Sequence, residues 1–169
     1  ALPSITKEQL SERLQKAVDT AGWPSLMPVQ QKAIPYLLEG RDLIVQSKTG
    51  SGKTGAFLLP IFARIDPNER GVQALIMAPT RELARQIHEE FVRLTSDRDT
   101  FGGLDGAIVY GGVSYQTQNQ ALRGGAQVVI GTPGRILDHL ERGTFTLDAL
   151  KTLVLDEADE MLSMGFQEE

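Results

Sequence analysis

The chain has 169 residues, enough for one ordinary domain, because a chain of this length buries roughly 70% of its unfolded surface. Its composition, 41% apolar and 23% charged, excludes a disordered or collagen-like polymer, and the absence of cysteine excludes disulfides, thiolate zinc sites and cysteine nucleophiles. The net charge of −5 argues against a protein that holds nucleic acid mainly through bulk positive charge.

Helices are predicted where apolar residues recur at helical spacing. The first begins at a capping box made by Thr6 and Gln9 and stops at Gly22. Its apolar face carries Leu10, Leu14, Ala17 and Val18. The other predicted helices cover residues 29–38, 52–65, 81–94, 115–123 and 135–142.

Five short apolar runs are predicted to be strands that are covered on both faces, because each is nearly continuous rather than alternating. They are residues 43–46, 74–78, 107–110, 128–130 and 153–155. Strands that alternate with helices indicate βαβ units and a mostly parallel sheet, which binds ligands at the carboxyl ends of its strands. We therefore expect the functional residues directly after each strand.

The two halves of the chain differ in charge. Residues 1–85 have 11 basic and 8 acidic side chains, whereas residues 86–169 have 6 and 14. A basic half suits phosphate and an acidic half suits a divalent cation, although solvated surface is the simpler explanation. Because the sequence shows no signal peptide and no apolar run of bilayer length, we expect a soluble protein. It starts without Met and ends without a helix stop signal, so we expect a fragment of a longer protein.

The residues after the first predicted strand form a phosphate-binding pattern, Ser47-Lys48-Thr49-Gly50-Ser51-Gly52-Lys53-Thr54. Glycines let successive backbone N–H groups turn toward phosphate oxygens, Lys53 can reach the outer phosphates, and the Thr54 hydroxyl can bind Mg²⁺. The usual pattern opens with glycine, and Ser47 stands there instead. A glycine-rich turn that precedes Lys-Thr by chance is the alternative, but the strand, loop and helix context favours a phosphate loop.

Residues 50–55 also match the glycine pattern of dinucleotide-binding folds. That pattern needs an acidic residue about 20 residues later, at the end of the next strand, to bind a ribose. Residues 72–80 contain no acidic residue, so we reject a dehydrogenase.

The last predicted strand is followed by four acidic residues within five positions, Asp156, Glu157, Asp159 and Glu160. Asp156 can hold a hydrated Mg²⁺, and Glu157 can orient and deprotonate an attacking water. A solvated helix start explains the same acids without any ligand. The phosphate loop earlier in the chain favours the catalytic interpretation.

Residues 156–159 spell Asp-Glu-Ala-Asp, and together with the phosphate loop they resemble the motifs of DEAD-box RNA helicases. Further matches follow in the family's order. Residues 79–84 resemble motif Ia, Gly111-Gly112 resembles the GG motif, and residues 132–135 resemble motif Ib; upstream, residues 22–23 and 28–30 resemble the Q motif. The chain is identified as a member of this family because several motifs in the right order do not arise by chance.

The resemblance implies an α/β fold: a RecA-like P-loop domain with a mostly parallel sheet and helices on both faces. Residues 1–169 are then a single N-terminal ATPase domain, with the Q-motif region and entry helices in residues 1–40 and the P-loop core in residues 41–169. The second RecA-like domain is absent from these residues. The implied activity is RNA-dependent ATP hydrolysis coupled to RNA unwinding or remodelling, and the isolated fragment is expected to be nearly inactive.

The resemblance also implies the ligands and partners. The cofactors are ATP and Mg²⁺. The partners are RNA, bound through sequence-nonspecific contacts to its backbone, and the second RecA-like domain of the same full-length chain. The expected location is cytoplasmic, without membrane contact.

The site residues follow from the same resemblance. Lys53, Asp156 and Glu157 are implied to be catalytic, and Thr54 and Asp156 are implied to hold Mg²⁺, partly through water. The implied nucleotide-binding residues are Trp23, Gln30, Ser47, Thr49, Gly50, Ser51, Gly52, Lys53 and Thr54. The implied RNA-binding residues are Pro79, Thr80, Arg81, Gly111, Gly112, Thr132, Gly134 and Arg135.

Adenine recognition departs from the family pattern. Gln30 has an amide donor and acceptor that can pair with the N6 and N7 edge of adenine. However, Leu26-Met27 stands where the family has Pro-Thr, and residues 1–22 contain no aromatic side chain to stack on the base. Adenine recognition is then weaker, or the stacking residue precedes the chain. Trp23 can pack against the nucleotide or fasten the first helix to the core.

Taken singly, other motif residues have simpler explanations: Thr132 as a helix cap, Gly111-Gly112 as a turn, and the arginines as surface residues. His88 and His139 have no metal-ligand partner at the right spacing, so both are interpreted as non-catalytic. Two other functions stay open: an ATP-gated RNA clamp or docking module that does not separate strands, and a DNA-directed helicase relative.

Overall fold

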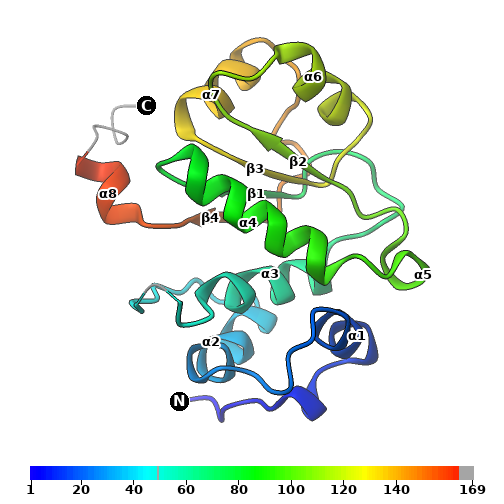
Figure 1. The fold of residues 1–169 in the computed structure, drawn as a ribbon, viewed down its shortest axis with the longest axis vertical. Coiled ribbons are helices and arrows are strands. Elements are labelled where there is room, and N and C mark those ends of the chain that lie inside the picture. Colours follow the sequence, from blue (N-terminus) through cyan, green and yellow to red (C-terminus); the bar gives the residue numbers. More distant parts are fainter. Residues whose placement is uncertain (49, 164–169) are drawn as a thin grey trace. The chain divides into compact units, whose positions relative to one another are not determined.

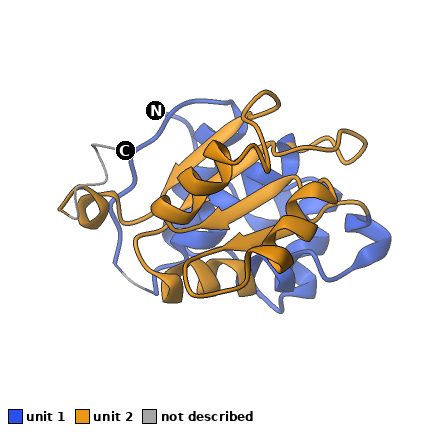
Figure 2. Cartoon of the chain, turned by 90° about the horizontal axis from the view of Figure 1, so that it is seen from above, with its two compact units in different colours: residues 1–64, 90–102 blue, residues 65–89, 103–169 orange. Residues whose placement is uncertain are grey.

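The computed structural model of the chain describes residues 1–48 and 50–163. These residues form two compact units (Figure 2): residues 1–64 with 90–102 make unit 1, and residues 65–89 with those from 103 onward make unit 2. Within the described residues, no helix is long and apolar enough to cross a membrane.

Unit 1 is helical. It contains the 3₁₀ turn Lys7–Gln9, α1 (Glu12–Thr20), α2 (Pro28–Leu38), α3 (Lys53–Arg64), α5 (Arg98–Phe101) and the end of α4 (Arg81–Leu94). The predicted start of the first helix is wrong. Gln9 Oε1 accepts a hydrogen bond from the Thr6 N–H at 2.8 Å and so closes the short turn, whereas α1 begins only after Ser11, whose Oγ accepts from the Leu14 N–H.

The core of unit 1 is built around Phe62 of α3. Its ring lies 5.6 Å from the ring of Phe91 and 5.8 Å from that of Phe101, measured between centroids. The guanidinium of Arg13 on α1 lies over the Phe101 ring, 5.1 Å from its centroid. These contacts join α1, α3, the end of α4 and α5, which are far apart in sequence.

The predicted strand at residues 43–46 is wrong. The structure assigns no strand there, and the Ile44 side chain is 93% exposed. A strand is stabilised by hydrogen bonds to a neighbour, and none of the described strands pairs with this segment. Three apolar residues in a row carry no information about whether such a neighbour exists.

Unit 2 contains a parallel sheet of β1 (Ala74–Met77), β2 (Gly106–Val109), β3 (Val128–Gly131) and β4 (Thr152–Leu155), in the order β2-β3-β1-β4 (Figure 1). The pairs are in register, with Ala74 opposite both Val128 and Thr152, and Gly106 opposite Val128. The four later predicted strands and the parallel α/β fold are therefore confirmed.

Helices follow each strand of unit 2: α4 after β1, α6 (Tyr115–Arg123) after β2, α7 (Pro133–Glu141) after β3 and α8 (Ala158–Ser163) after β4. In Figure 1, α6 and α7 lie on the same side of the sheet. One core cluster joins strand residues to these helices; its members include Leu75, Met77, Val109, Val129, Leu122 of α6, Ile136 of α7 and Met161 of α8. Alternate strand residues thus face these helices, as the pleat of a sheet requires.

The strand β4 is less covered than predicted. Leu153 is 54% exposed and Leu155 is 41% exposed, so the expectation of burial on both faces is wrong for this strand. Leu153 and Leu155 alternate with the partly buried Thr152 and Val154, so the two exposed leucines share one face of β4.

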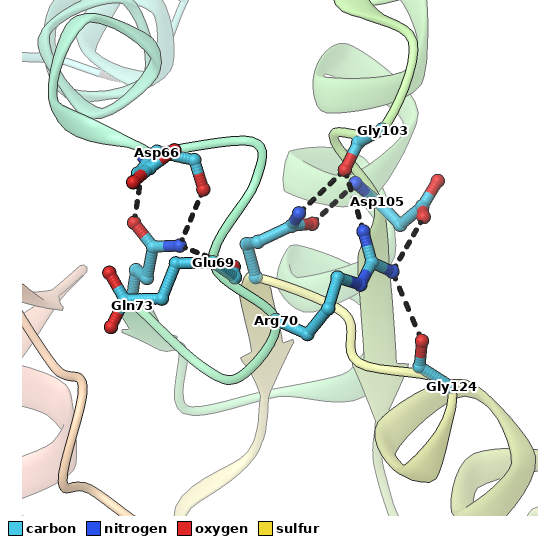
Figure 3. A network of polar contacts seen from close by, with 8 residues as sticks. Asp66, Glu69, Arg70, Gln73, Gly103, Asp105 and Gly124 are labelled. Atoms are coloured by element: carbon cyan, nitrogen blue, oxygen red, sulfur yellow. Dashed lines mark hydrogen bonds and ion pairs between the residues drawn. The ribbon is translucent and has the colours of Figure 1, made fainter.

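Side-chain hydrogen bonds link the loops at the amino edge of the sheet (Figure 3). Gln73, directly before β1, donates from Nε2 to the carbonyl oxygens of Asp66 and Glu69, both at 2.8 Å. Arg70 donates to the carbonyl oxygens of Gly103 at 2.9 Å and Gly124 at 3.0 Å. The loops at this edge thus satisfy one another's polar groups.

Candidate functional site

Segments that follow three different strands meet at the carboxyl edge of the unit 2 sheet. Arg81 Nη1, after β1, donates to the carbonyl oxygen of Gly111, after β2, at 3.2 Å. Arg135 Nη1, after β3, donates to the carbonyl oxygen of Val113 at 3.1 Å. The three segments that resemble motifs Ia, GG and Ib therefore contact one another, as the position of each behind a parallel strand led us to expect.

Glycines keep this edge open to close approach. A Cβ on Gly112, which has φ of 85°, would lie 2.7 Å from Arg81 Nη1, so a side chain there would displace the arginine. A Cβ on Gly134 would meet nothing within 4 Å, so no internal contact requires glycine at that position. The open space beside Gly134, at the start of α7, would let a group from outside the chain come close to the backbone.

The threonines of this edge stand at helix starts. Thr80 is exposed, and its Oγ1 accepts a hydrogen bond from the Leu83 N–H at 3.1 Å at the start of α4. Thr132 precedes α7, and its N–H donates to the carbonyl oxygen of Val109 at 3.1 Å. Pro79 is buried, so it shapes the turn and does not present a contact surface. Helix starts carry partial positive charge and suit phosphate.

A buried amide supports the arginine of this edge. Gln118 of α6 is 3% exposed, and its Oε1 accepts from Arg135 Nη1 at 3.2 Å while its Nε2 donates to the carbonyl oxygen of Tyr110 at 3.0 Å. His139 Nε2 lies 2.7 Å from the same Oε1. Because this oxygen is an acceptor, His139 carries its proton on Nε2. Its Nδ1 is buried and has no hydrogen-bond partner in the described part of the chain.

The backbone turns sharply after β4. The Asp156 N–H donates to the carbonyl oxygen of Met77 at 2.9 Å, which extends the pairing with β1, and Asp156 is only 4% exposed. Glu157 has φ of 53° and is the one non-glycine residue of positive φ in the part of the chain that the structure describes. Such a conformation costs energy and is concentrated at functional sites. With this backbone conformation Glu157 lies exposed just before α8, whereas the preceding Asp156 is buried.

The phosphate-loop pattern lies in unit 1, and Thr49 of this pattern lies outside the described residues. Gly50 and Gly52 have φ of 81° and 89°, the left-handed conformation that the pattern requires of them. The Oγ atoms of Ser47 and Ser51 are buried and have no hydrogen-bond partner among the described residues. The helix α3 begins at Lys53, two residues after Ser51, so orphaned hydroxyls and a helix N-terminus occur together, a donor set that fits phosphate.

The Q-motif segment contacts this loop. Gln30 is 1% exposed; its Nε2 donates to the carbonyl oxygen of Gly52 at 3.0 Å, and its Oε1 accepts from the Met27 N–H at 2.8 Å. Trp23 packs on the first turn of α3, because a Cβ on Gly55 would lie 2.5 Å from its indole. The Gln30 amide keeps one further N–H and one further lone pair for a ligand.

No group of three or more His, Asp or Glu side chains is placed to hold a metal ion among residues 1–48 and 50–163. Mg²⁺ needs no such group, because it is usually bound through one or two carboxylates, water and substrate phosphates.

Residues 27–169 match the family model described as DEAD/DEAH box helicase, which covers more than half of the chain. The chain belongs to the DEAD/DEAH box helicase family. Similar curated proteins include the ATP-dependent RNA helicase CshA of Listeria monocytogenes, 51% identical over 93% of this chain, and the ATP-dependent RNA helicase DeaD of Haemophilus influenzae, 52% identical over 93% of it. This helicase-family chain spans 29% and 25% of the lengths of these two relatives.

Solved structures agree with the fold of this DEAD-box chain. The crystal structure of a DEAD box protein from the hyperthermophile Methanococcus jannaschii matches 95% of the chain with a TM-score of 0.83 and 42% identity, and the chain covers 43% of that protein. A hypothetical ATP-dependent RNA helicase from Sulfolobus tokodaii matches with a TM-score of 0.82 and 36% identity over 94% of the chain and 45% of that protein. The predicted RecA-like α/β fold of the helicase family is confirmed.

The sequence patterns assign no role to Gln118 in this DEAD-box domain, and they address His139 only as a possible metal ligand. A signal was present, because Gln118 precedes Leu122 by one helical turn on the apolar face of the predicted helix. A glutamine on a buried face needs internal partners, and such a position merits attention.

His139 gives the DEAD-box domain an acid-sensitive point. Burial lowers the pKa of this fully buried imidazole, the nearby Arg135 charge lowers it further, and Asp138 opposes both effects. Folding therefore favours the neutral ring. The resulting stability is complete above the unfolded pKa of about 6.5 and is lost as the pH falls through the folded pKa.

We expect the melting temperature to fall as the pH is lowered from 7.5 to 5.5, by roughly 2–4 °C for each kcal/mol lost in a chain of this size. His139→Gln should flatten this dependence, as followed by circular dichroism. Burial also lowers the pKa of His88, so His88→Gln measures the share of the pH dependence that this second histidine contributes. An unchanged pH dependence in His139→Gln would show that His139 is not the responsible group.

Proposed function

We propose that this domain binds ATP with Mg²⁺ and the sugar–phosphate backbone of RNA, and that with a second RecA-like domain it couples ATP hydrolysis to unwinding or remodelling of RNA duplexes. The observation that carries the proposal is the contact of Arg81 and Arg135 with the loop of residues 111–113 at one edge of the sheet. The names of the relatives, ATP-dependent RNA helicases, support it. The proposed domain boundaries are residues 1–40 for the Q-motif region and 41–169 for the P-loop core, and the proposed location is cytoplasmic.

In this proposal the phosphate loop holds the nucleotide. The backbone N–H groups of residues 50–54 and the hydroxyls of Ser47, Thr49 and Ser51 donate to phosphate oxygens, and Lys53 binds the outer phosphates. The hydroxyls of Ser47 and Ser51 support this assignment, because both are buried and have no hydrogen-bond partner within residues 1–48 and 50–163. Gln30 reads the adenine edge with its second donor and acceptor, and Trp23 shapes the pocket by packing on α3.

The acidic strand end supplies the reaction chemistry. Asp156 and Thr54 are the residues that would hold Mg²⁺, partly through water. The ion, when bound, supplies positive charge at the phosphate oxygens. Exposed Glu157 accepts a proton from the attacking water. Its strained backbone supports a catalytic role, because such strain needs a compensating function.

The carboxyl edge of unit 2 binds the RNA backbone. Thr80, Thr132 and the N–H groups at the starts of α4 and α7 donate to phosphates, while Arg81 and Arg135 add charge. Gly111, Gly112 and Gly134 let the RNA strand approach the protein backbone closely. Pro79 fixes the turn before Thr80. Because such contacts read no base, binding should be indifferent to sequence, which reconciles an acidic domain with an RNA ligand.

Arg81→Ala tests the RNA site. We expect it to weaken binding to all single-stranded RNA sequences alike and to lower the salt slope of log K by about 0.7, the value for one lost phosphate contact. Fluorescence anisotropy over a series of salt concentrations measures both. The control is Arg123→Ala, which removes an exposed arginine from the last turn of α6 in the same unit. Equal losses in the two variants, or a loss confined to certain sequences, would contradict the proposed site.

Strand displacement then tests the coupled activity. The domain joined to a second RecA-like domain should separate a short RNA duplex when ATP is added. Nucleotide-dependent retention of RNA without displacement would indicate a clamp. Preference for DNA over RNA of equal length would indicate a DNA-directed relative, since a protein that reads the 2′-hydroxyl prefers RNA.

A further inference from the structure

Gln118 connects the two ends of the loop that contains the paired glycines. Its Nε2 holds the carbonyl oxygen of Tyr110, the residue directly before Gly111, at 3.0 Å. Its Oε1 accepts from Arg135 Nη1, and the same Nη1 donates to the carbonyl oxygen of Val113. A closed chain of hydrogen bonds therefore runs from the start of the loop through Gln118 and Arg135 to its end.

The same amide fixes the direction of Arg135. With Nη1 committed to Val113 and Gln118, Nη2 lies beside Gly111, where a Cβ would be 4.0 Å away. The Tyr115 ring supports the guanidinium, whose Cζ lies 3.9 Å from the ring centroid. The second donor face of Arg135 is thereby presented at the glycine loop.

Burial makes this arrangement strict. Gln118 is 3% exposed and His139 is fully buried, so water cannot replace a lost partner at low cost. The His139 Nε2 proton satisfies the remaining lone pair of the Gln118 oxygen, which prevents the amide from turning round. Of the two orientations of the Gln118 amide, one alone satisfies Tyr110, Arg135 and His139 together.

We propose that Gln118 is a positioning residue for RNA binding, because it holds the loop of residues 110–113 and the Arg135 guanidinium in the arrangement that receives the sugar–phosphate backbone. This proposal rests on the RNA site proposed above. Gln118 itself does not touch RNA; it acts through Arg135 and the loop. Because the loop and the guanidinium are already ordered before RNA binds, less conformational entropy is lost on binding, and affinity rises without an added contact.

A double-mutant cycle between Gln118→Met and Arg135→Ala tests the proposal, with this chain and a fluorescent single-stranded RNA. Methionine keeps the length of the side chain and removes all three hydrogen bonds. Gln118→Met should weaken RNA binding about tenfold and lower the salt slope as Arg135→Ala does, yet add little in the Arg135→Ala background. A role in stability alone would leave the salt slope unchanged. Additive losses, or unchanged affinity in a folded Gln118→Met chain, would overturn the proposal.

Gln118→Glu keeps the test decisive should the methionine variant not fold. Its carboxylate still accepts from Arg135 and His139, but it loses the donation to Tyr110 and partly neutralises the Arg135 charge that would face RNA. RNA affinity and the salt slope of this variant should therefore fall toward those of Arg135→Ala, and unchanged affinity and slope in a folded Gln118→Glu chain would contradict the positioning role. If Arg135→Ala itself leaves affinity and slope unchanged, the proposed RNA site fails and this inference falls with it. A loss in Arg135→Ala but none in Gln118→Met rejects the inference alone.

Discussion

Replacing Lys53 with alanine is expected to weaken the binding of adenine nucleotide by about 10- to 150-fold, the equivalent of one hydrogen bond to a charged group. Lys53 begins α3, directly after the loop in which the hydroxyls of Ser47 and Ser51 are buried and find no partner in the part of the chain that the structure describes. Its ammonium group can neutralise phosphate charge that the backbone N–H groups alone leave uncompensated. Titration of the chain with a fluorescent ADP analogue in the presence of Mg²⁺ measures the loss.

The matched control for this variant is Lys32→Ala, which removes an exposed lysine from α2 in the same unit. It changes the net charge of the chain by the same amount, so a purely long-range electrostatic effect would appear in both variants. An equally large loss in Lys32→Ala would mean that Lys53 does not contact phosphate.

The Glu157→Gln variant should do the opposite: nucleotide affinity stays near normal while hydrolysis falls on the order of 10²- to 10⁴-fold, the usual contribution of a general base. Glutamine has the same shape as glutamate, so the unusual backbone of position 157 has no new reason to change. What is lost is the ability to accept a proton. Hydrolysis is measured with RNA and a second RecA-like domain present, and affinity is measured on the same preparation.

Glu160→Gln, an exposed acid on α8, controls for the loss of one negative charge near this end of the sheet. We expect it to hydrolyse ATP normally. If Glu157→Gln lowers nucleotide affinity as far as Lys53→Ala does, Glu157 has a structural role. Comparing Lys53→Ala with Glu157→Gln therefore separates nucleotide binding from the chemical step. Neither variant makes this distinction alone.

Local sequence signals predicted the parallel sheet well. Four apolar runs became β1 to β4, and the residues placed behind β1, β2 and β3 gather at one edge because parallel strands end together. The binding roles of those residues stay predictions. The same signals were wrong at residues 43–46 and only partly right at β4, since burial depends on which segments are neighbours in space.

Side-chain contacts over long sequence distances were the least predictable. Thr6 and Gln9 do form the reciprocal pair that the sequence suggests, but it closes a short turn, and Ser11 starts the helix. Gln118 lies 17 residues from Arg135, and nothing in either local segment indicates that the two side chains meet. Helical periodicity predicts that Gln118 is buried beside Leu122. Its hydrogen-bond partners can be identified only in the folded chain.

The open side of β4 has a practical consequence for handling the chain. Among the described strands β4 pairs with β1 alone, so its other edge is a template on which further polypeptide can pair, and residues 152–155 carry no lysine or proline to discourage such pairing. The side chains of Leu153 and Leu155 are exposed on the same strand. At high concentration these 169 residues should therefore tend to aggregate into assemblies of no fixed size. Biophysical work on the chain belongs at low concentration, with particle size monitored throughout.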